Sequence, residues 1–158
     1  MSTKYKMTIP GHCYPLKTHR PIQPLRTGGK GSRWMFQFKS KAGLKWAGCR
    51  PSLGKTDKLR DYQERAVYEI MRQWAAPGGG RMAPLEGKVG ITITIYYSGQ
   101  QPDAFGPSET IFDILQDAKV VRDDVQLVPC GTPAISRVHC KKAVEHVEIL
   151  VWDLEEQS

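Results

Sequence analysis

Six of the sixteen acidic residues in this 158-residue chain lie between residues 102 and 126. Clustered carboxylates are suited to a divalent metal such as Mg²⁺, which takes oxygen ligands and is often held by two or three acids. A metal held in this way activates water and stabilises charge on a phosphate, so the cluster predicts metal-assisted phosphodiester chemistry. The plainer interpretation is a helix with a solvated acidic face and an ordinary Asp-Asp turn. The six acids are Asp103, Glu109, Asp113, Asp117, Asp123 and Asp124.

A strand is predicted immediately before the first of these acids. Residues 90–97 alternate strictly over Ile91, Ile93 and Ile95, which indicates a strand with one buried face. Its end leads the chain through Gln100 and Gln101 to Asp103. The sequence therefore places Asp103 at the mouth of a sheet.

A helix and a turn are predicted to position the other acids. The helix begins near Pro107-Ser108, where proline suits a first turn and serine can act as the cap. Its acids recur every four residues on the side opposite its apolar stripe. The turn Asp123-Asp124 follows, and residues 125–128 then read as a strand. If this turn lies beside the end of the 90–97 strand, two chain-distant groups of acids meet in one space.

The remaining elements define the expected fold class. Residues 4–9 indicate a first strand, and residues 57–76 a long amphipathic helix with apolar residues at three- and four-residue steps. Residues 138–142 and 143–154 suggest further extended segments. This order predicts an α+β fold with two main helices packed on a mixed or antiparallel sheet.

We expect one domain covering residues 1–158, with no internal repeat. Glycine and proline interrupt residues 11–58 so often that this range is predicted to be a long basic loop region. A loop of that length inside a compact domain is usually functional or partly disordered. Residues 155–158 are expected to form a frayed tail.

The charge balance indicates a polyanionic partner. The chain has 23 Lys and Arg against 16 Asp and Glu, for a net charge of +7, and the first sixty residues hold most of the excess. Basic residues interleaved with aromatics between Trp34 and Trp46 suit phosphate contact combined with base stacking. The alternative is that residues 34–38 form a short core strand. The candidate nucleic-acid-binding residues here are Lys17, Arg20, Arg26, Lys30 and Arg33.

Cysteine usage and hydropathy narrow the class of protein. The four cysteines are widely separated and form no C-x-x-C pair, so free reduced thiols are expected. A zinc site using His12, Cys13, His139 and Cys140 is the alternative.

No run approaches the roughly 18 apolar residues of a membrane span, and the polar start is not a signal peptide. We therefore expect a cytoplasmic protein that does not enter a membrane.

The order of motifs in residues 102–126 resembles that of a known family. The chain has Asp103, then Phe112-Asp113-Ile114-Leu115, then Asp123-Asp124-Val125-Gln126, with no insertion between them. The RusA family of Holliday-junction resolvases, small phage and bacterial endonucleases, has Asp-x-Asp-Asn/Gly after a strand, a lysine, Phe-Asp-x-Leu on a helix and a closing Asp-Asp-x-Gln. A weaker similarity links residues 15–21 to the family's early basic loop.

This resemblance implies a fold, a partner and a reaction. It implies a RusA-like homodimer that binds branched DNA and nicks strands of like polarity with Mg²⁺ or Mn²⁺, in DNA recombination and repair. By position, Asp103 and Asp124 would be metal ligands, with Asp123 beside them. The expected function is therefore a Mg-dependent structure-specific endodeoxyribonuclease that resolves Holliday junctions.

Two positions depart from the family pattern. Phe105 stands where the second aspartate is expected, and Glu109 where the lysine is expected. In one account the ligand set has moved, so that Glu109 and Asp113 complete the site of Asp103 and Asp124.

If the ligand set has moved, Lys17, Arg20 or Arg122 contacts the phosphate. In the second account, the chain has the same fold and binds branched DNA but no longer cuts it. The reason is that the negative charge of Glu109 opposes the approach of the phosphate. A further alternative is a non-enzymatic interaction or adaptor protein.

Overall fold

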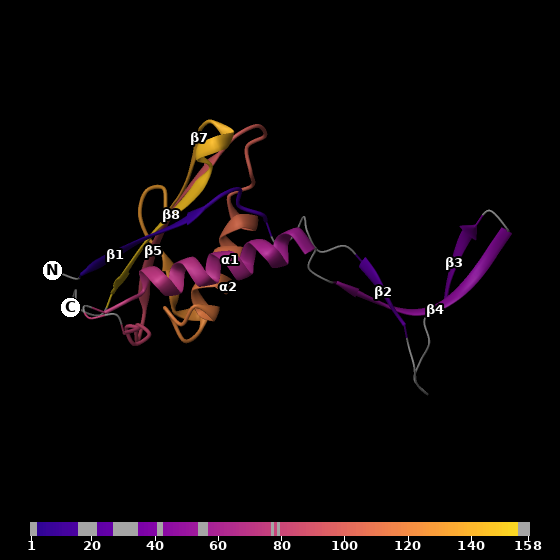
Figure 1. The fold of residues 1–158 in the computed structure, drawn as a ribbon, viewed down its shortest axis with the longest axis horizontal. Helices are drawn as coiled ribbons and strands as arrows, with labels where there is room; N and C mark the ends of the chain where they lie inside the picture. Colours follow the sequence, from indigo (N-terminus) through magenta and orange to yellow (C-terminus); the bar gives the residue numbers. More distant parts are fainter. Residues whose placement is uncertain are drawn as a thin grey trace.

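A mixed five-stranded sheet forms the centre of the structure, which is a computed structural model (Figure 1). β8 (His146–Asp153) lies between β1 (Lys4–Pro10) and β5 (Val89–Tyr97) and is antiparallel to both. On its other side β5 pairs in parallel with β6 (Leu127–Pro129) near its start and with β7 (Ile135–His139) near its end. The described backbone covers residues 3–15, 22–26, 35–40, 43–53, 57–76, 78 and 80–154, and the described side chains are those of residues 3–15, 57–76, 78 and 80–154.

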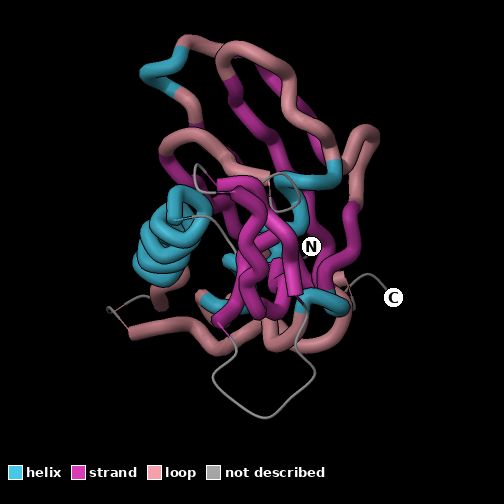
Figure 2. Tube along the Cα trace, turned by 90° about the vertical axis from the view of Figure 1, so that its right-hand side faces the viewer, coloured by secondary structure: helices cyan, strands magenta, loops and turns pink. Residues whose placement is uncertain are grey.

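Two helices cover one face of this sheet. α1 (Asp57–Gln73) packs against β1 and against α2 (Phe105–Asp117). Figure 2, turned by 90°, looks nearly along α1. Alternate strand positions face the helices because successive side chains on a strand point to opposite faces. The strand residues buried on this side include Met7, Ile9, Ile91, Ile93, Ile95, Val147, Ile149 and Val151.

The prediction of a small single-domain α+β fold with a mixed sheet and two helices is confirmed. The strand expected at 90–97 is β5, and the helix expected at 57–76 is α1, which ends at Gln73. Among the helices of the described ranges, none is long and apolar enough to cross a membrane.

The opposite face of the sheet contains a close contact that requires a glycine. Trp152 of β8 lies over Gly90 of β5, and a Cβ atom at residue 90 would overlap the indole ring. Trp152 is only 8 % exposed as a result. Lys4 Nζ lies 5.0 Å from the centre of the same ring, a cation–π arrangement.

The free edge of β1 is covered by a side chain from α1. Gln73 Oε1 accepts a hydrogen bond from Thr8 N–H, and Gln73 Nε2 donates to Thr8 O, each at 2.7 Å. The glutamine amide therefore satisfies both backbone groups that Thr8 turns away from β8. It also ties the last turn of α1 to the sheet.

A second sheet occupies part of the range predicted to be a long loop, so that prediction is wrong in this respect. β4 (Gly43–Leu53) pairs antiparallel with β2 (Ile22–Arg26) on one side and β3 (Met35–Ser40) on the other. In Figure 1 this sheet lies apart from the first, beyond the N-terminal end of α1. We call residues 22–53, which contain these three strands, the arm.

β3 corresponds to the short strand expected at residues 34–38. The proposed core burial of its aromatic residues lies outside the described side chains. The other two strands were missed because proline supplies no ladder hydrogen bond and argues against a strand. In the structure Pro24 of β2 stands opposite Pro51 of β4.

Candidate functional site

Asp103 lies on the exposed loop that joins β5 to α2. Its Oδ1 is 3.5 Å from the Phe105 nitrogen, a long contact directed at the first turn of α2. The loop is held from the neighbouring strand, because Arg137 Nη1 of β7 donates to Pro102 O at 3.1 Å. As expected, the chain leads from the end of β5 at Tyr97 through a short loop to Asp103.

The start of α2 is covered by the chain that leaves β1. Pro15 packs so closely on Gly106 that a Cβ atom there would lie 2.9 Å from the proline. Thr110 Oγ1 donates to Tyr14 O at 2.8 Å. The segment that leads toward the arm is therefore fixed against the first turns of α2.

The predicted helix start is wrong by about two residues. α2 begins at Phe105, and Ser108 does not cap it. The Ser108 hydroxyl instead donates to Phe105 O at 2.6 Å, one turn back inside the helix. The next three residues, Gly106, Pro107 and Ser108, are buried, whereas Phe105 is 68 % exposed.

The acidic turn is built by a reciprocal cap. Asp123 Oδ1 accepts from Val125 N–H at 3.1 Å and caps η2 (Asp124–Gln126), a single 3₁₀ turn. Gln126 Oε1 accepts from the N–H groups of Arg122 and Asp123 at 2.7 and 3.0 Å. Asp123 and Gln126 therefore have structural roles that explain their spacing without a metal.

Gln126 also fixes the turn to the chain before β5. Its Nε2 donates to Leu85 O at 3.2 Å and to Gly87 O at 2.8 Å. One amide thus joins two segments that are about 40 residues apart in the chain. Asp124, in contrast, is exposed, and the cap of this turn is supplied by Asp123.

The two neighbouring carboxyl groups titrate as a pair. A hydrogen bond from the Val125 N–H, and then one shared with Asp124, lower the pKa of Asp123. The hydrogen bond with Asp123 raises the pKa of Asp124, and partial burial and the negative charges of Asp123 and Asp113 add to this effect. A cation beside the pair would favour the ionised form of Asp124.

The proposed metal ligands do not gather in the described part of one chain. Asp103 precedes α2, whereas the Asp123-Asp124 turn follows this helix and packs back against it. The described residues contain no group of three or more His, Cys, Asp or Glu side chains that could hold a metal ion. The described residues of one chain therefore do not bring Asp103, Glu109, Asp113, Asp123 and Asp124 together as a single site with three or more metal ligands.

Two helix acids lie between these ends. Glu109 and Asp113 are half-buried on α2, and both take part in interactions, whereas Asp117 is exposed at the last turn. Asp113 is close enough to affect the titration of Asp124. Of the predicted acids, the structure therefore brings Asp113 electrostatically near the Asp123-Asp124 turn.

Most of the predicted nucleic-acid-binding side chains lie outside the described ones. Arg122 is described and pairs with Glu86, with 2.5 Å between Nη2 and Oε1 and both side chains largely exposed. Arg26 ends β2, where only the backbone is described. The others, Lys17, Arg20, Lys30 and Arg33, fall outside the described residues.

The sequence shows how unevenly charge is divided between the two parts of the chain. Residues 1–56 contain twelve Lys and Arg and no Asp or Glu, whereas residues 57–158 contain eleven Lys and Arg and all sixteen acids. Seven of the basic residues belong to the arm. The arm is therefore wholly cationic, while the part that carries α1 and α2 has a net negative charge.

A carboxylate network that the sequence patterns did not predict closes one end of the central sheet. Glu145, whose side chain is 8 % exposed, accepts hydrogen bonds from Ser98 N–H at 2.8 Å and Ser98 Oγ at 2.6 Å. His12 Nδ1 lies 3.5 Å from the same oxygen. The contacts join residues 47 and 133 positions apart, so no local spacing could have revealed them.

The zinc alternative finds no support among the described residues. Cys13 is buried, and burial raises the pKa of its thiol to about 12. Its neighbour His12 is exposed, and Cys130 and Cys140 are free thiols. Because Cys13 is enclosed in the core and His12 is exposed, these two neighbours do not face one common space.

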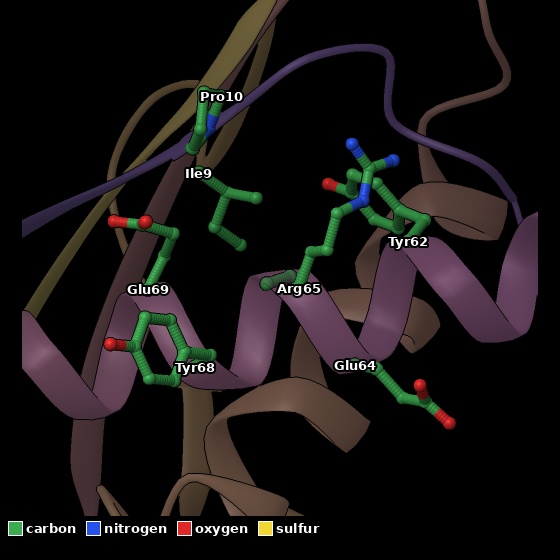
Figure 3. Close-up of a pocket in the computed structure, with 8 residues that line it drawn as sticks. Ile9, Pro10, Tyr62, Glu64, Arg65, Tyr68 and Glu69 are labelled. Atoms are coloured by element: carbon green, nitrogen blue, oxygen red, sulfur yellow. The ribbon is translucent and has the colours of Figure 1, made fainter.

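A pocket of about 360 Å³ lies between the end of β1 and α1 (Figure 3). It is mainly apolar, with Ile9, Tyr62 and Ala66 among its lining residues, and it is far in the chain from the acidic turn. Tyr68 stands at its rim and is 67 % exposed. Nothing in this lining indicates a reaction.

A comparison with models of known protein families finds no match to this chain, and neither does a comparison with curated proteins.

Proposed function

We propose that this protein is a RusA-like branched-DNA-binding protein that holds the DNA backbone with its cationic arm. The observation that carries the proposal is the separation of charge: the first 56 residues contain twelve Lys and Arg and no acid. The three-stranded sheet of the arm presents part of that charge apart from the rest of the chain (Figure 1). A surface of one sign attracts a polyanion and releases its counterions on binding.

The acids of the other part favour binding over cutting. Glu109 stands where the resemblance expects a lysine, and Phe105 where it expects an aspartate. A half-buried Glu109 would repel the phosphate that a lysine would attract. With no group of three metal-binding side chains in the described residues, the non-cutting relative is the better-supported of the two accounts.

Metal-dependent cleavage is the second candidate, and one observation favours it. Asp123 and Asp124 are adjacent carboxylates, and Asp113 lies close enough to act on Asp124 electrostatically, so a cation there would offset the repulsion between like charges. A nuclease would use Mg²⁺ or Mn²⁺ there, together with ligands that one protomer does not gather. A homodimer, which the resemblance implies, is one way to supply them.

Binding is tested with a fluorescently labelled four-way DNA junction and a linear duplex of the same sequence. We expect tighter binding to the junction, with an affinity that falls steeply as salt increases. Replacing Lys39 and Lys45 of the arm by Gln should reduce the slope of log K against log[salt] by about 1 for each phosphate that the arm no longer neutralises. The matched control replaces Lys141 and Lys142, which are exposed residues of the chain just before β8, and should leave the slope unchanged.

Cleavage is tested on the same junction with Mg²⁺, Mn²⁺ or a chelator. We expect intact DNA for the natural sequence. Changing Phe105→Asp together with Glu109→Lys restores the family pattern and should permit metal-dependent nicking if those two positions alone prevent it.

Nicking by the natural sequence that Asp124→Asn abolishes, with binding retained, would establish the nuclease instead. If neither DNA form binds, the nucleic-acid proposal fails and an adaptor protein becomes the better account.

A further inference from the structure

The first residue of α2 is an aromatic side chain that the fold leaves outside its core. Phe105 is 68 % exposed, although Gly106, Pro107 and Ser108 directly after it are buried. An exposed phenyl ring gives up the hydrophobic stabilisation that burial supplies. Burial in the core therefore does not account for phenylalanine at this position, and its ring is accessible for contact with another molecule.

Phe105 lies beside the last described residues before the arm. Pro15 packs against Gly106, and Tyr14 O accepts a hydrogen bond from Thr110, so these residues are held on the same helix turns. DNA bound by the arm near its attachment would thus lie close to the Phe105 ring.

The charges around Phe105 determine which part of DNA it can meet. Asp103 precedes it by two residues and Glu109 follows it by one helix turn, and carboxylates there disfavour phosphates. The uncharged face of a base is attracted to an aromatic ring, and apolar side chains enter base steps most readily where stacking is already broken. A branch point supplies such bases, whereas an intact duplex does not.

From this geometry we infer that Phe105 stacks on an exposed base at the branch point of DNA held by the arm. The inference rests on the proposed function and adds the contact that distinguishes branched from linear DNA. Phosphate contacts of the arm supply affinity for both forms, and the phenyl ring supplies the preference.

The test uses a four-way junction with 2-aminopurine at the branch point, because stacking quenches the fluorescence of this base analogue. Phe105→Ala should weaken binding to the junction by roughly fivefold to a hundredfold and change binding to linear duplex less than twofold. It should also remove the protein-dependent fluorescence change. Phe105→Trp should retain both properties, and Phe105→Leu, which is apolar but not aromatic, should lose the fluorescence change.

Tyr68→Ala provides the matched control, because Tyr68 is an aromatic residue of almost equal exposure, at 67 %, on the other helix. It should leave both measurements unchanged. If the natural protein prefers the junction and Phe105→Ala does so equally, the inference is overturned while the proposed function stands. If Phe105→Ala weakens binding to the junction and to linear duplex equally, the inference is also overturned, because the Phe105 contact would then not distinguish branched from linear DNA. If the natural protein binds neither form, both proposals fail together.

Discussion

Removing the Glu145 carboxylate is expected to destabilise the fold more than any nearby surface change. Glu145 lies just before β8, and its one carboxylate oxygen receives both the Ser98 N–H and the Ser98 hydroxyl. Its backbone O accepts from Gly11 N–H at 2.8 Å, so the residue joins the ends of β1 and β5. Glu145→Ala would leave both Ser98 donors without this partner in a partly buried place.

The size of the effect follows from those two hydrogen bonds. A hydrogen bond to a charged group contributes about 1.5–3 kcal/mol, and water that enters the site recovers part of the loss. We therefore expect Glu145→Ala to lower the free energy of unfolding by about 3 kcal/mol. The 3.5 Å contact with His12 is too long to add much.

Urea denaturation at pH 7 measures this change, with Glu148→Ala as the control. Glu148 is 31 % exposed and pairs with Lys6 at 3.1 Å, so its loss should cost at most about 1 kcal/mol. If Glu145→Ala lowers the free energy of unfolding no more than Glu148→Ala does, the stabilising role given to the Glu145 hydrogen bonds is wrong.

The same hydrogen bonds of Glu145 predict that stability depends on pH. The hydrogen bonds from Ser98 hold the pKa of Glu145 below its ordinary value of 4.5 in the folded state. Its contribution is therefore complete above pH 4.5 and is lost as the pH falls through the lower, folded-state pKa. The stability difference between the natural protein and Glu145→Gln should shrink on acidification below pH 4.5, and a constant difference from pH 7 to pH 3 would contradict this assignment.

Two further substitutions test contacts on the sheet and at the acidic turn. Gly90→Val should push Trp152 off the sheet, lower the free energy of unfolding by about 1–3 kcal/mol and shift tryptophan emission to the red, as measured by urea denaturation and fluorescence. An unchanged emission spectrum with unchanged stability would refute the close contact. Gln126→Leu should leave two carbonyl and two N–H groups without their partner and cost about 2 kcal/mol, measured by thermal unfolding, whereas Asp124→Asn should change stability by less than about 0.5 kcal/mol because Asp124 is exposed. Equal costs for these two changes would contradict the different roles given to the two residues.

Local periodicity predicted the elements of the central fold well. β5 follows from the alternation of Ile91, Ile93 and Ile95, and all three face the helices. α1 follows from apolar residues at three- and four-residue steps, each of which is buried: Leu59, Tyr62, Ala66, Ile70 and Trp74. These signals are strong because one buried face fixes the spacing of its residues along the chain.

The arm could not be predicted in the same way. Its strands contain Pro24 and Pro51, and β4 also contains Gly43 and Gly48, residues that usually mark loops. Pairing between β2 and β4 joins residues 23 to 31 positions apart, and no periodic pattern within either strand encodes that partner. The sequence did indicate the charge of this region and a short strand near Phe36.

The candidate site was predicted in part. Sequence order placed Asp103 after β5 and the Asp123-Asp124 turn before β6, and both placements are confirmed. That these two groups of acids lie side by side was an inference about distance. The described residues of one chain contain no group of three metal-binding side chains. The roles of Gln126 and Glu145 depend on partners about 40 and 47 residues away, which spacing alone does not show.

The hydrogen bonds of Gln73 have a consequence for how this protein can associate. A strand from a second molecule that extended the central sheet along the middle of β1 would need the N–H and C=O groups of Thr8, which Gln73 already occupies. Such an addition would have to release the last turn of α1 as well as displace the amide. Gln73 therefore discourages edge-to-edge aggregation along β1, and assembly of two copies is better served by other surfaces of the chain.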